Sequence, residues 1–115
     1  MVEPHSAGEK IATNLRKGVL EFCVLALLSR REMYGLELAN ALVERGLTAS
    51  EGSLYPLLAR MREAGAVETR WESPQGARAR RYYAVTDEGR AQLELFEGVW
   101  GEISGQVERV LEEQS

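Results

Sequence analysis

The amino-acid sequence predicts a mostly α-helical chain that carries one small β-hairpin. Four segments have apolar residues at helical spacing, and the segment before the last helix alternates apolar with charged residues on both sides of a Ser-Pro-Gln-Gly turn. A length of 115 residues, with 44% hydrophobic and 28% charged residues, is that of one globular domain. Domains of this size are marginally stable alone, so self-association is a reasonable expectation.

The first helix is expected to begin near Leu15. Residues 1–14 are polar and of mixed charge, which predicts a flexible arm. The apolar stretch over residues 18–29 carries a single charge, Glu21, so the helix is apolar on nearly every side. Because such a helix has to be covered all round, we expect one side of it to lie against a second subunit.

The next two segments predict two helices joined by a short glycine-containing turn, a helix-turn-helix. The second helix spans about residues 34–45 and stops at Gly46-Leu47; its apolar positions are Leu36, Leu38, Ala39, Leu42 and Val43. The third helix opens with a Thr48–Glu51 capping box or with Ser50 as its cap, and it ends at Gly65. Its apolar face consists of Leu54, Leu57, Leu58 and Met61. Pro56 inside it predicts either a late start or a bend.

A two-stranded hairpin is expected after the third helix. Val67, Thr69 and Trp71 alternate with charged residues before the turn, and Tyr83 and Val85 do so after it. Helix-turn-helix followed by a hairpin is the order of elements in a winged helix. The hairpin is also basic, with arginines at positions 70, 78, 80 and 81 and no acidic residue between Glu72 and Asp87.

The last helix is expected to run from Thr86, as N-cap, to about Glu113, a length of roughly 40 Å at 1.5 Å per residue. Its apolar residues are spaced alternately three and four apart, as in the seam of a coiled coil: Leu93, Phe96, Trp100, Ile103, Val107 and Val110. This seam predicts a dimer interface across a two-fold axis, with Leu15 of the first helix also part of it. Gly98, Gly101 and Gly105 lie on the opposite, glutamate-rich face, and the sequence gives no reason for them.

The predicted organisation is therefore a flexible arm (1–14), a winged helix-turn-helix (15–86) and a dimerisation helix (87–115).

Charge is distributed unevenly along the chain. The formal net charge is -4, yet residues 45–81 carry seven basic and four acidic side chains, whereas residues 82–115 carry two and eight. A chain divided in this way can present a cationic face to a polyanion such as DNA while its acidic helix lies elsewhere.

Several classes of protein are disfavoured. The longest uncharged apolar stretch, residues 22–28, is far too short to cross a membrane, and residues 1–14 do not have the pattern of a signal peptide, so a cytoplasmic protein is expected. One cysteine, Cys23, and one histidine, His5, offer no disulfide, metal site or catalytic pair. We therefore expect neither a cofactor nor enzymatic activity.

Five motifs in order resemble the PadR-like family of bacterial transcriptional regulators. They are L-R-K-G at 15–18, M-Y-G-L-E-L at 33–38, E-G-S-L-Y-P-L-L-A-R-M at 51–61, R-R-Y-Y-A-V-T-D-E-G at 80–89, and Trp100 in the last helix. The resemblance implies a homodimeric winged-helix repressor of the short-tailed branch. Its third helix would enter the major groove of promoter DNA and its hairpin would follow the backbone or the minor groove. Ser53 stands where threonine is frequent, and the first 14 residues are poor in basic side chains.

The candidate DNA-binding residues come from the start of the third helix and from the hairpin. Hydroxyls at a helix start and exposed arginines contact phosphates or base edges, which selects Ser50, Ser53, Tyr55, Arg60, Arg78, Arg80 and Arg81. Each has a structural alternative: Ser50 and Ser53 as plain caps, Tyr55 as a residue packed between helices, Arg60 as a residue on the solvent side of the third helix, and the hairpin arginines as a solvated turn.

The resemblance also implies an apolar pore at the dimer centre, where a flat aromatic effector stacks on a tryptophan at the place of Trp100. The candidate effector-binding residues are Phe96, Trp100, Ile103, Val19 and Phe22, although seam packing alone also accounts for the first three.

An alternative function is a winged-helix module that binds a partner protein, which the acidic net charge favours. The clustered arginines favour DNA.

Overall fold

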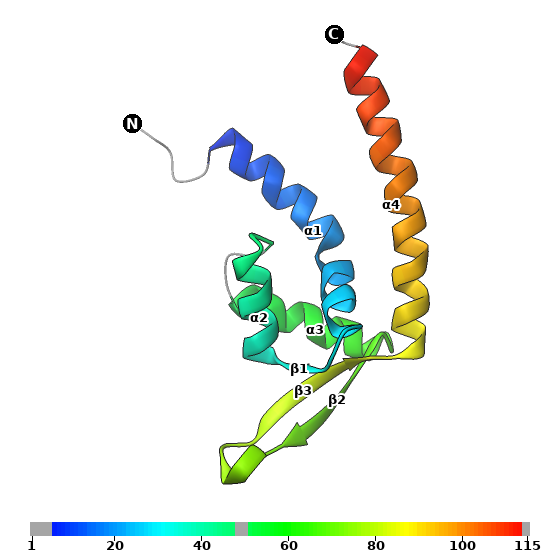
Figure 1. Ribbon diagram of the computed structural model, residues 1–115. Coiled ribbons are helices and arrows are strands. Elements are labelled where there is room, and N and C mark those ends of the chain that lie inside the picture. The colour runs from blue at the N-terminus through cyan, green and yellow to red at the C-terminus, as the bar shows by residue number, and fades with distance from the viewer. Residues whose placement is uncertain (1–5, 48–50, 114–115) are drawn as a thin grey trace.

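The computed structural model describes residues 6–47 and 51–113, and it confirms a mostly helical chain with one small sheet. Figure 1 shows a compact body formed by α2, α3 and the end of α1, with the hairpin projecting below it and α4 rising beside α1. The helices are α1 (Ala7–Leu28), α2 (Gly35–Glu44), α3 (Leu54–Glu63) and α4 (Asp87–Glu113), and the strands are β1 (Met33–Tyr34), β2 (Val67–Glu72) and β3 (Arg80–Val85). Two 3₁₀ turns, η1 (Glu51–Ser53) and η2 (Pro74–Gly76), complete the elements.

Helix α1 begins at Ala7, so the prediction of a flexible arm is wrong for residues 7–14. Ser6 caps the helix, its Oγ accepting a hydrogen bond from the Glu9 N–H at 3.2 Å. The pair has the S-x-x-E spacing of a capping box, a signal that the polar composition of this segment obscured. Residues 1–5 of the predicted arm, which include His5, lie outside the described residues.

The turn after α2 is as predicted. Gly46 has φ +71°, its N–H donates to Val43 O at 3.0 Å, and the Leu47 N–H donates to Leu42 O at 2.9 Å. This pair of bonds is a Schellman motif, which ends the helix. Leu36 and Val43, both expected on the buried face of α2, are instead exposed.

Helix α3 starts late, which removes the difficulty with Pro56. Because the helix begins at Leu54, Pro56 lies in its first turn, where a backbone N–H has no partner within the helix in any case. The predicted caps, Thr48 and Ser50, lie outside the described residues; Ser53 is the N-cap residue and makes no side-chain capping bond there.

The sheet has a strand that the sequence pattern did not predict. β1 pairs antiparallel with β3 through Met33↔Tyr83 and Tyr34↔Tyr82, which gives the order β1-β3-β2. A strand of two residues is too short to show alternation, so the periodicity could not reveal it. The hairpin itself is confirmed, with Val67 opposite Val85 and Trp71 opposite Arg81.

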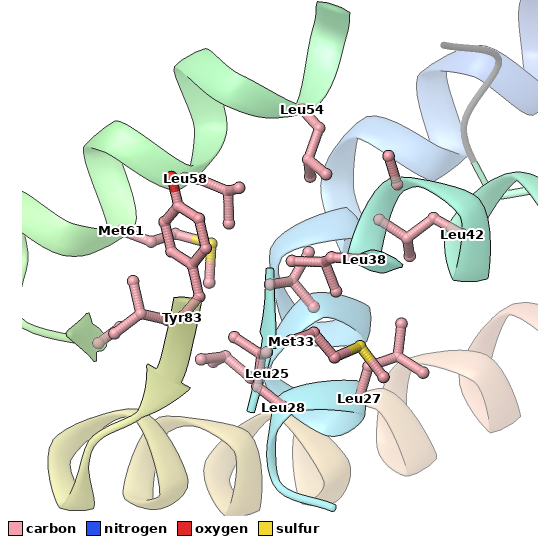
Figure 2. Packing of buried hydrophobic residues seen from close by; sticks show 14 residues of the cluster. Leu25, Leu27, Leu28, Met33, Leu38, Leu42, Leu54, Leu58, Met61 and Tyr83 are labelled. Atoms are coloured by element: carbon pink, nitrogen blue, oxygen red, sulfur yellow. The ribbon is translucent and has the colours of Figure 1, made fainter. Parts of the chain in front are cut away.

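The core lies where α1, α2, α3 and the base of the sheet meet (Figure 2). Its fully buried large side chains are Val24, Leu25, Leu38, Leu42, Leu54, Leu58 and Met61. The α1 residues of this core all come from its C-terminal third, whereas Leu15 is 66% exposed. No helix in the described part of the chain is long and apolar enough to cross a membrane.

Helix α4 lies largely outside the core. As predicted, Thr86 caps it, because the Thr86 Oγ1 accepts from the Gly89 N–H at 3.0 Å. Phe96 stacks on Phe22 of α1 with ring centroids 4.2 Å apart. Beyond that contact the predicted seam is uncovered in the single chain, with Trp100, Ile103, Val107 and Val110 each about half exposed.

Candidate nucleic-acid interface

A groove of about 540 Å³ lies between the start of α2, the start of α3 and the hairpin. Four of the predicted DNA-binding residues line it, namely Tyr55, Arg78, Arg80 and Arg81. They come from segments more than 20 residues apart in sequence, and the winged-helix topology brings them to one surface. The remaining lining residues are Tyr34, Gly35, Leu36, Trp71 and Tyr83.

Tyr55 combines packing with exposure. A Cβ at Gly35 would lie only 2.9 Å from Tyr55 Cε1 and 3.0 Å from its hydroxyl, so the ring lies directly against the α2 backbone. The side chain is nevertheless 41% exposed. The alternative interpretation of Tyr55, a residue packed between helices, is therefore correct in part. The same contact explains why position 35 carries glycine.

The arginines of the hairpin rest on aromatic rings. Arg80 Cζ lies 4.3 Å from the ring centroid of Tyr34, and Arg81 Cζ lies 5.6 Å from that of Trp71. Stacking restricts a guanidinium and leaves its N–H groups able to donate at the edge. In the part of the chain that the structure describes, Arg78, Arg80 and Arg81 form no ion pair. Their charge is therefore available to an anionic partner.

Arg70 behaves differently from the other hairpin arginines. Its Nη2 lies 2.5 Å from Glu32 Oε1, its Nη1 pairs with Glu72, and its Cζ lies 4.9 Å from the Tyr82 ring centroid. The hydrogen bond with Arg70 lowers the pKa of the Glu32 carboxyl. Arg70 thus ties the middle of β2 to the segment before β1 and does not line the groove.

Two predicted DNA-binding residues lie elsewhere. Ser53 and Arg60 line a separate groove between α3 and α1, and Ser50 lies outside the described residues. The structure adds Trp71, 67% exposed, to the groove beside the hairpin arginines. A tryptophan on one strand of a basic hairpin is a visible signal, but the alternation was used only to predict the hairpin.

The five predicted effector-binding residues line one cavity of about 500 Å³ between α1 and α4. Val19 and Phe22 contribute from α1, and Phe96, Trp100 and Ile103 from α4. Phe96 stacks on Phe22, and its ring centroid lies 5.9 Å from that of Trp100. The cavity is therefore a mostly apolar slot with aromatic walls, and Leu15 lies at its edge.

No cluster of three potential metal ligands is present among residues 6–47 and 51–113. Burial raises the pKa of the Cys23 thiol, so the thiolate needed for redox chemistry is disfavoured.

Comparison with known proteins places this arrangement in a family. Residues 24–95 match the model of the transcriptional regulator PadR-like family. A PadR-like transcriptional regulator from Bacillus cereus is 41% identical, with a TM-score of 0.77 over 85% of this chain and 96% of that chain. A PadR family transcriptional regulator from Eggerthella lenta is 32% identical, with a TM-score of 0.81 over 90% of each chain.

A more distant relative has been solved with its ligand. Bacillus subtilis PadR, in complex with operator DNA, is 22% identical, with a TM-score of 0.62 over 68% of this chain and 45% of that chain. At this identity the likeness concerns the fold. Together, the family match over residues 24–95 and the two closer structures establish that this chain belongs to the PadR-like family of transcriptional regulators.

Proposed function

We propose that this chain is a homodimeric repressor that binds promoter DNA through α3 and the hairpin. The observation that carries the proposal is the groove in which Tyr55 faces Arg78, Arg80 and Arg81, three arginines that have no ion pair among the described residues. Phosphate contacts from such side chains supply much of the affinity for DNA. The operator complex of Bacillus subtilis PadR supports the same class of ligand for this fold.

The dimer is supported by the uncovered seam of α4. Trp100, Ile103, Val107 and Val110 are about half exposed and follow one another along the same face. A patch of this kind on a small domain is typical of a protein interface. A two-fold axis through it would relate the two α3 helices, so the operator is expected to be a near-palindrome with half-sites about 34 Å apart.

Relief of repression is proposed to come from a flat aromatic effector in the cavity between α1 and α4. The cavity is within the size range of small-molecule sites, and three of its lining residues are aromatic: Phe22, Phe96 and Trp100. Planar aromatic compounds should quench Trp100 fluorescence in a Trp71→Phe variant, where Trp100 is the only tryptophan. A broad panel of such compounds without quenching would argue against the effector.

The test of DNA binding is a titration of the full chain with the duplex immediately upstream of its own gene, next to a scrambled duplex of equal composition. Specific binding should exceed non-specific binding by about 10³-fold or more, and affinity should fall steeply between about 50 and 200 mM salt. Equal affinity for both duplexes would contradict the proposal. Binding of a protein partner, the alternative function, would show little dependence on salt.

A further inference from the structure

A second groove, of about 480 Å³, lies between α1 and α3. It opens on the other side of α1 from the aromatic cavity. Thr13, Lys17 and Leu20 line this groove, whereas Leu15, Val19 and Phe22 line the cavity, and at 100° per residue these sets point in nearly opposite directions. Arg16 lies between the two faces and lines both openings. Apart from Arg16, the α1 residues of this groove belong neither to the proposed DNA interface nor to the effector cavity.

The rim of the groove is cationic. Arg16 and Lys17 come from α1 and Arg60 comes from α3. None of the three forms an ion pair within the described part of the chain, in contrast to Arg31 and Arg70, which do. Three like charges around one opening repel each other, so an anion in the groove would be favoured by all of them.

The floor of the same groove is aliphatic. Leu20, Leu47 and Leu57 line it, and all three are half-buried residues that pack against the core. An inorganic anion would satisfy the rim and leave this floor exposed, whereas a neutral apolar molecule would cover the floor and leave the cations unpaired. Only a molecule with a charged head and an apolar body matches both parts.

We propose that the groove between α1 and α3 binds an amphipathic organic anion, whose head lies among Arg16, Lys17 and Arg60 and whose aliphatic body covers the three leucines. The absence of aromatic side chains from the lining distinguishes it from the cavity between α1 and α4. The volume is within the range of small-molecule pockets.

Occupancy of this groove is expected to lower operator affinity, a step that rests on the proposed function. Arg60 and Ser53 belong both to the groove and to the proposed DNA-binding residues of α3. An anionic head bound to Arg60 neutralises a charge that would otherwise contact the DNA backbone. Ligand and operator would therefore compete for the same face of the third helix.

Binding is tested first without DNA, by calorimetric titration of the full chain with hexanoate, octanoate and decanoate below micellar concentrations. Affinity should rise about fourfold per methylene added. Decanol, which has the body without the charge, should bind at least about fivefold more weakly than decanoate. Equal affinity for decanol, or no binding of decanoate, would overturn the proposal.

Variants locate the site. Lys17→Gln combined with Arg60→Gln should weaken decanoate binding about tenfold. Lys10→Gln, a cation of α1 that does not line the groove, and Val99→Ala, in the aromatic cavity, should change it less than twofold. Unchanged affinity in the double variant would overturn the proposal. A second pattern of results would also overturn it. If the double variant binds operator with a shallower salt dependence and the wild-type chain does not bind decanoate, these cations belong to the DNA interface.

The competition is measured separately with the operator duplex. Saturating decanoate should raise the operator Kd of the wild-type chain at least about tenfold and leave that of the double variant unchanged. An operator Kd that decanoate does not alter would overturn the competition. A chain that binds decanoate as expected but binds no duplex specifically would instead contradict the proposed function, so the two failures are distinguishable.

Discussion

Neighbouring arginines of the hairpin have different roles because their partners differ. Arg70 is paired with Glu32 and Glu72, whereas Arg80 lies over the Tyr34 ring and has no acidic partner in the described ranges. Composition predicts a basic hairpin, but not which arginines are free, since Glu32 lies 38 residues from Arg70 in sequence. The partner of a charged side chain is set by the fold, and the sequence pattern alone does not show it.

Arg80→Ala is predicted to weaken operator binding and to make its salt dependence shallower. Removing one phosphate contact from each subunit should reduce the slope of log K against log salt by about 0.9 per contact. Arg80→Lys keeps the charge and should retain most of the slope, and Arg109→Ala on α4 should leave the slope unchanged. An unaltered slope in Arg80→Ala would mean that this side chain does not contact the DNA backbone.

Glu32→Gln is predicted to lower stability near neutral pH and to have no effect in acid. Arg70 holds the pKa of the folded Glu32 carboxyl below its ordinary value of 4.5, so the pair contributes stability above that pH and loses it as the pH falls through the lowered pKa. The effect should be small, as is usual for exposed pairs. Thermal unfolding from pH 7 to pH 3 should show the difference from wild type closing in acid.

Glu94→Gln is the control for this comparison, because Glu94 is exposed on α4 and forms no ion pair in the described part of the chain. Its melting temperature should follow that of the wild-type chain at every pH. If the difference in melting temperature between Glu32→Gln and the wild-type chain stays constant from pH 7 to pH 3, the charge of Glu32 is not the source of the stability.

At the scale of elements, the junction between α3 and α4 fixes how the two helices are related. Thr86 Oγ1 donates to Gly65 O at 2.6 Å, and the Thr86 N–H donates to Ala66 O at 3.1 Å. Gly89 is the one buried residue of α4 in the described range, and a Cβ there would lie 2.2 Å from Ala66 O. The start of α4 therefore lies against the end of the third helix with no room for a side chain.

Gly89→Ala is predicted to destabilise the chain by about 1–3 kcal/mol, the usual cost of forcing an atom into a packed site. Gly98→Ala is the matched control, because its Cβ would meet nothing within 4 Å, and loss of glycine flexibility should stabilise the helix by about 0.5–1 kcal/mol. Denaturant unfolding at one fixed protein concentration measures both. Equal stability of the two variants would contradict this account of the junction.

The elements that could be predicted from the sequence were those with a strong periodic signal or a standard stop. The two inner helices, the hairpin and α4 were predicted because Gly46, Gly65, Pro74-Gly76 and Thr86 mark their ends. The start of α1 and the strand β1 were missed. The start of α1 depends on a capping pair in a polar segment, and β1 depends on pairing with residues of β3 that lie 48 and 50 positions further along the chain.

The candidate site could be predicted in part for a similar reason. Tyr55 and the hairpin arginines without ion pairs were identified from their positions at the start of a helix and in a basic turn. Trp71 and Tyr34 were not, because their roles depend on which arginine lies over each ring. The five candidate effector-binding residues line one cavity between α1 and α4, and their role in binding an effector stays a prediction.

At the scale of the whole molecule, the proposed function requires a second copy of the chain. The exposed seam of α4 and the exposed N-terminal half of α1 frame a cavity that the single chain leaves open. Ile103→Asp, which places a charge at the centre of that seam, is predicted to give monomers by light scattering and to lower operator affinity at least about tenfold. Glu102→Gln, one position away and off the seam, should remain dimeric. A dimeric Ile103→Asp would exclude this face as the interface.

The most direct test of a two-fold DNA-binding dimer is the native mass of the complex between the full chain and its operator duplex. We predict two chains of 12.8 kDa on each duplex at every protein-to-DNA ratio, with no one-chain complex accumulating. A stable complex with one chain per duplex would contradict the proposed dimer if that chain binds the duplex as tightly as the chains do in the complex formed at saturating protein.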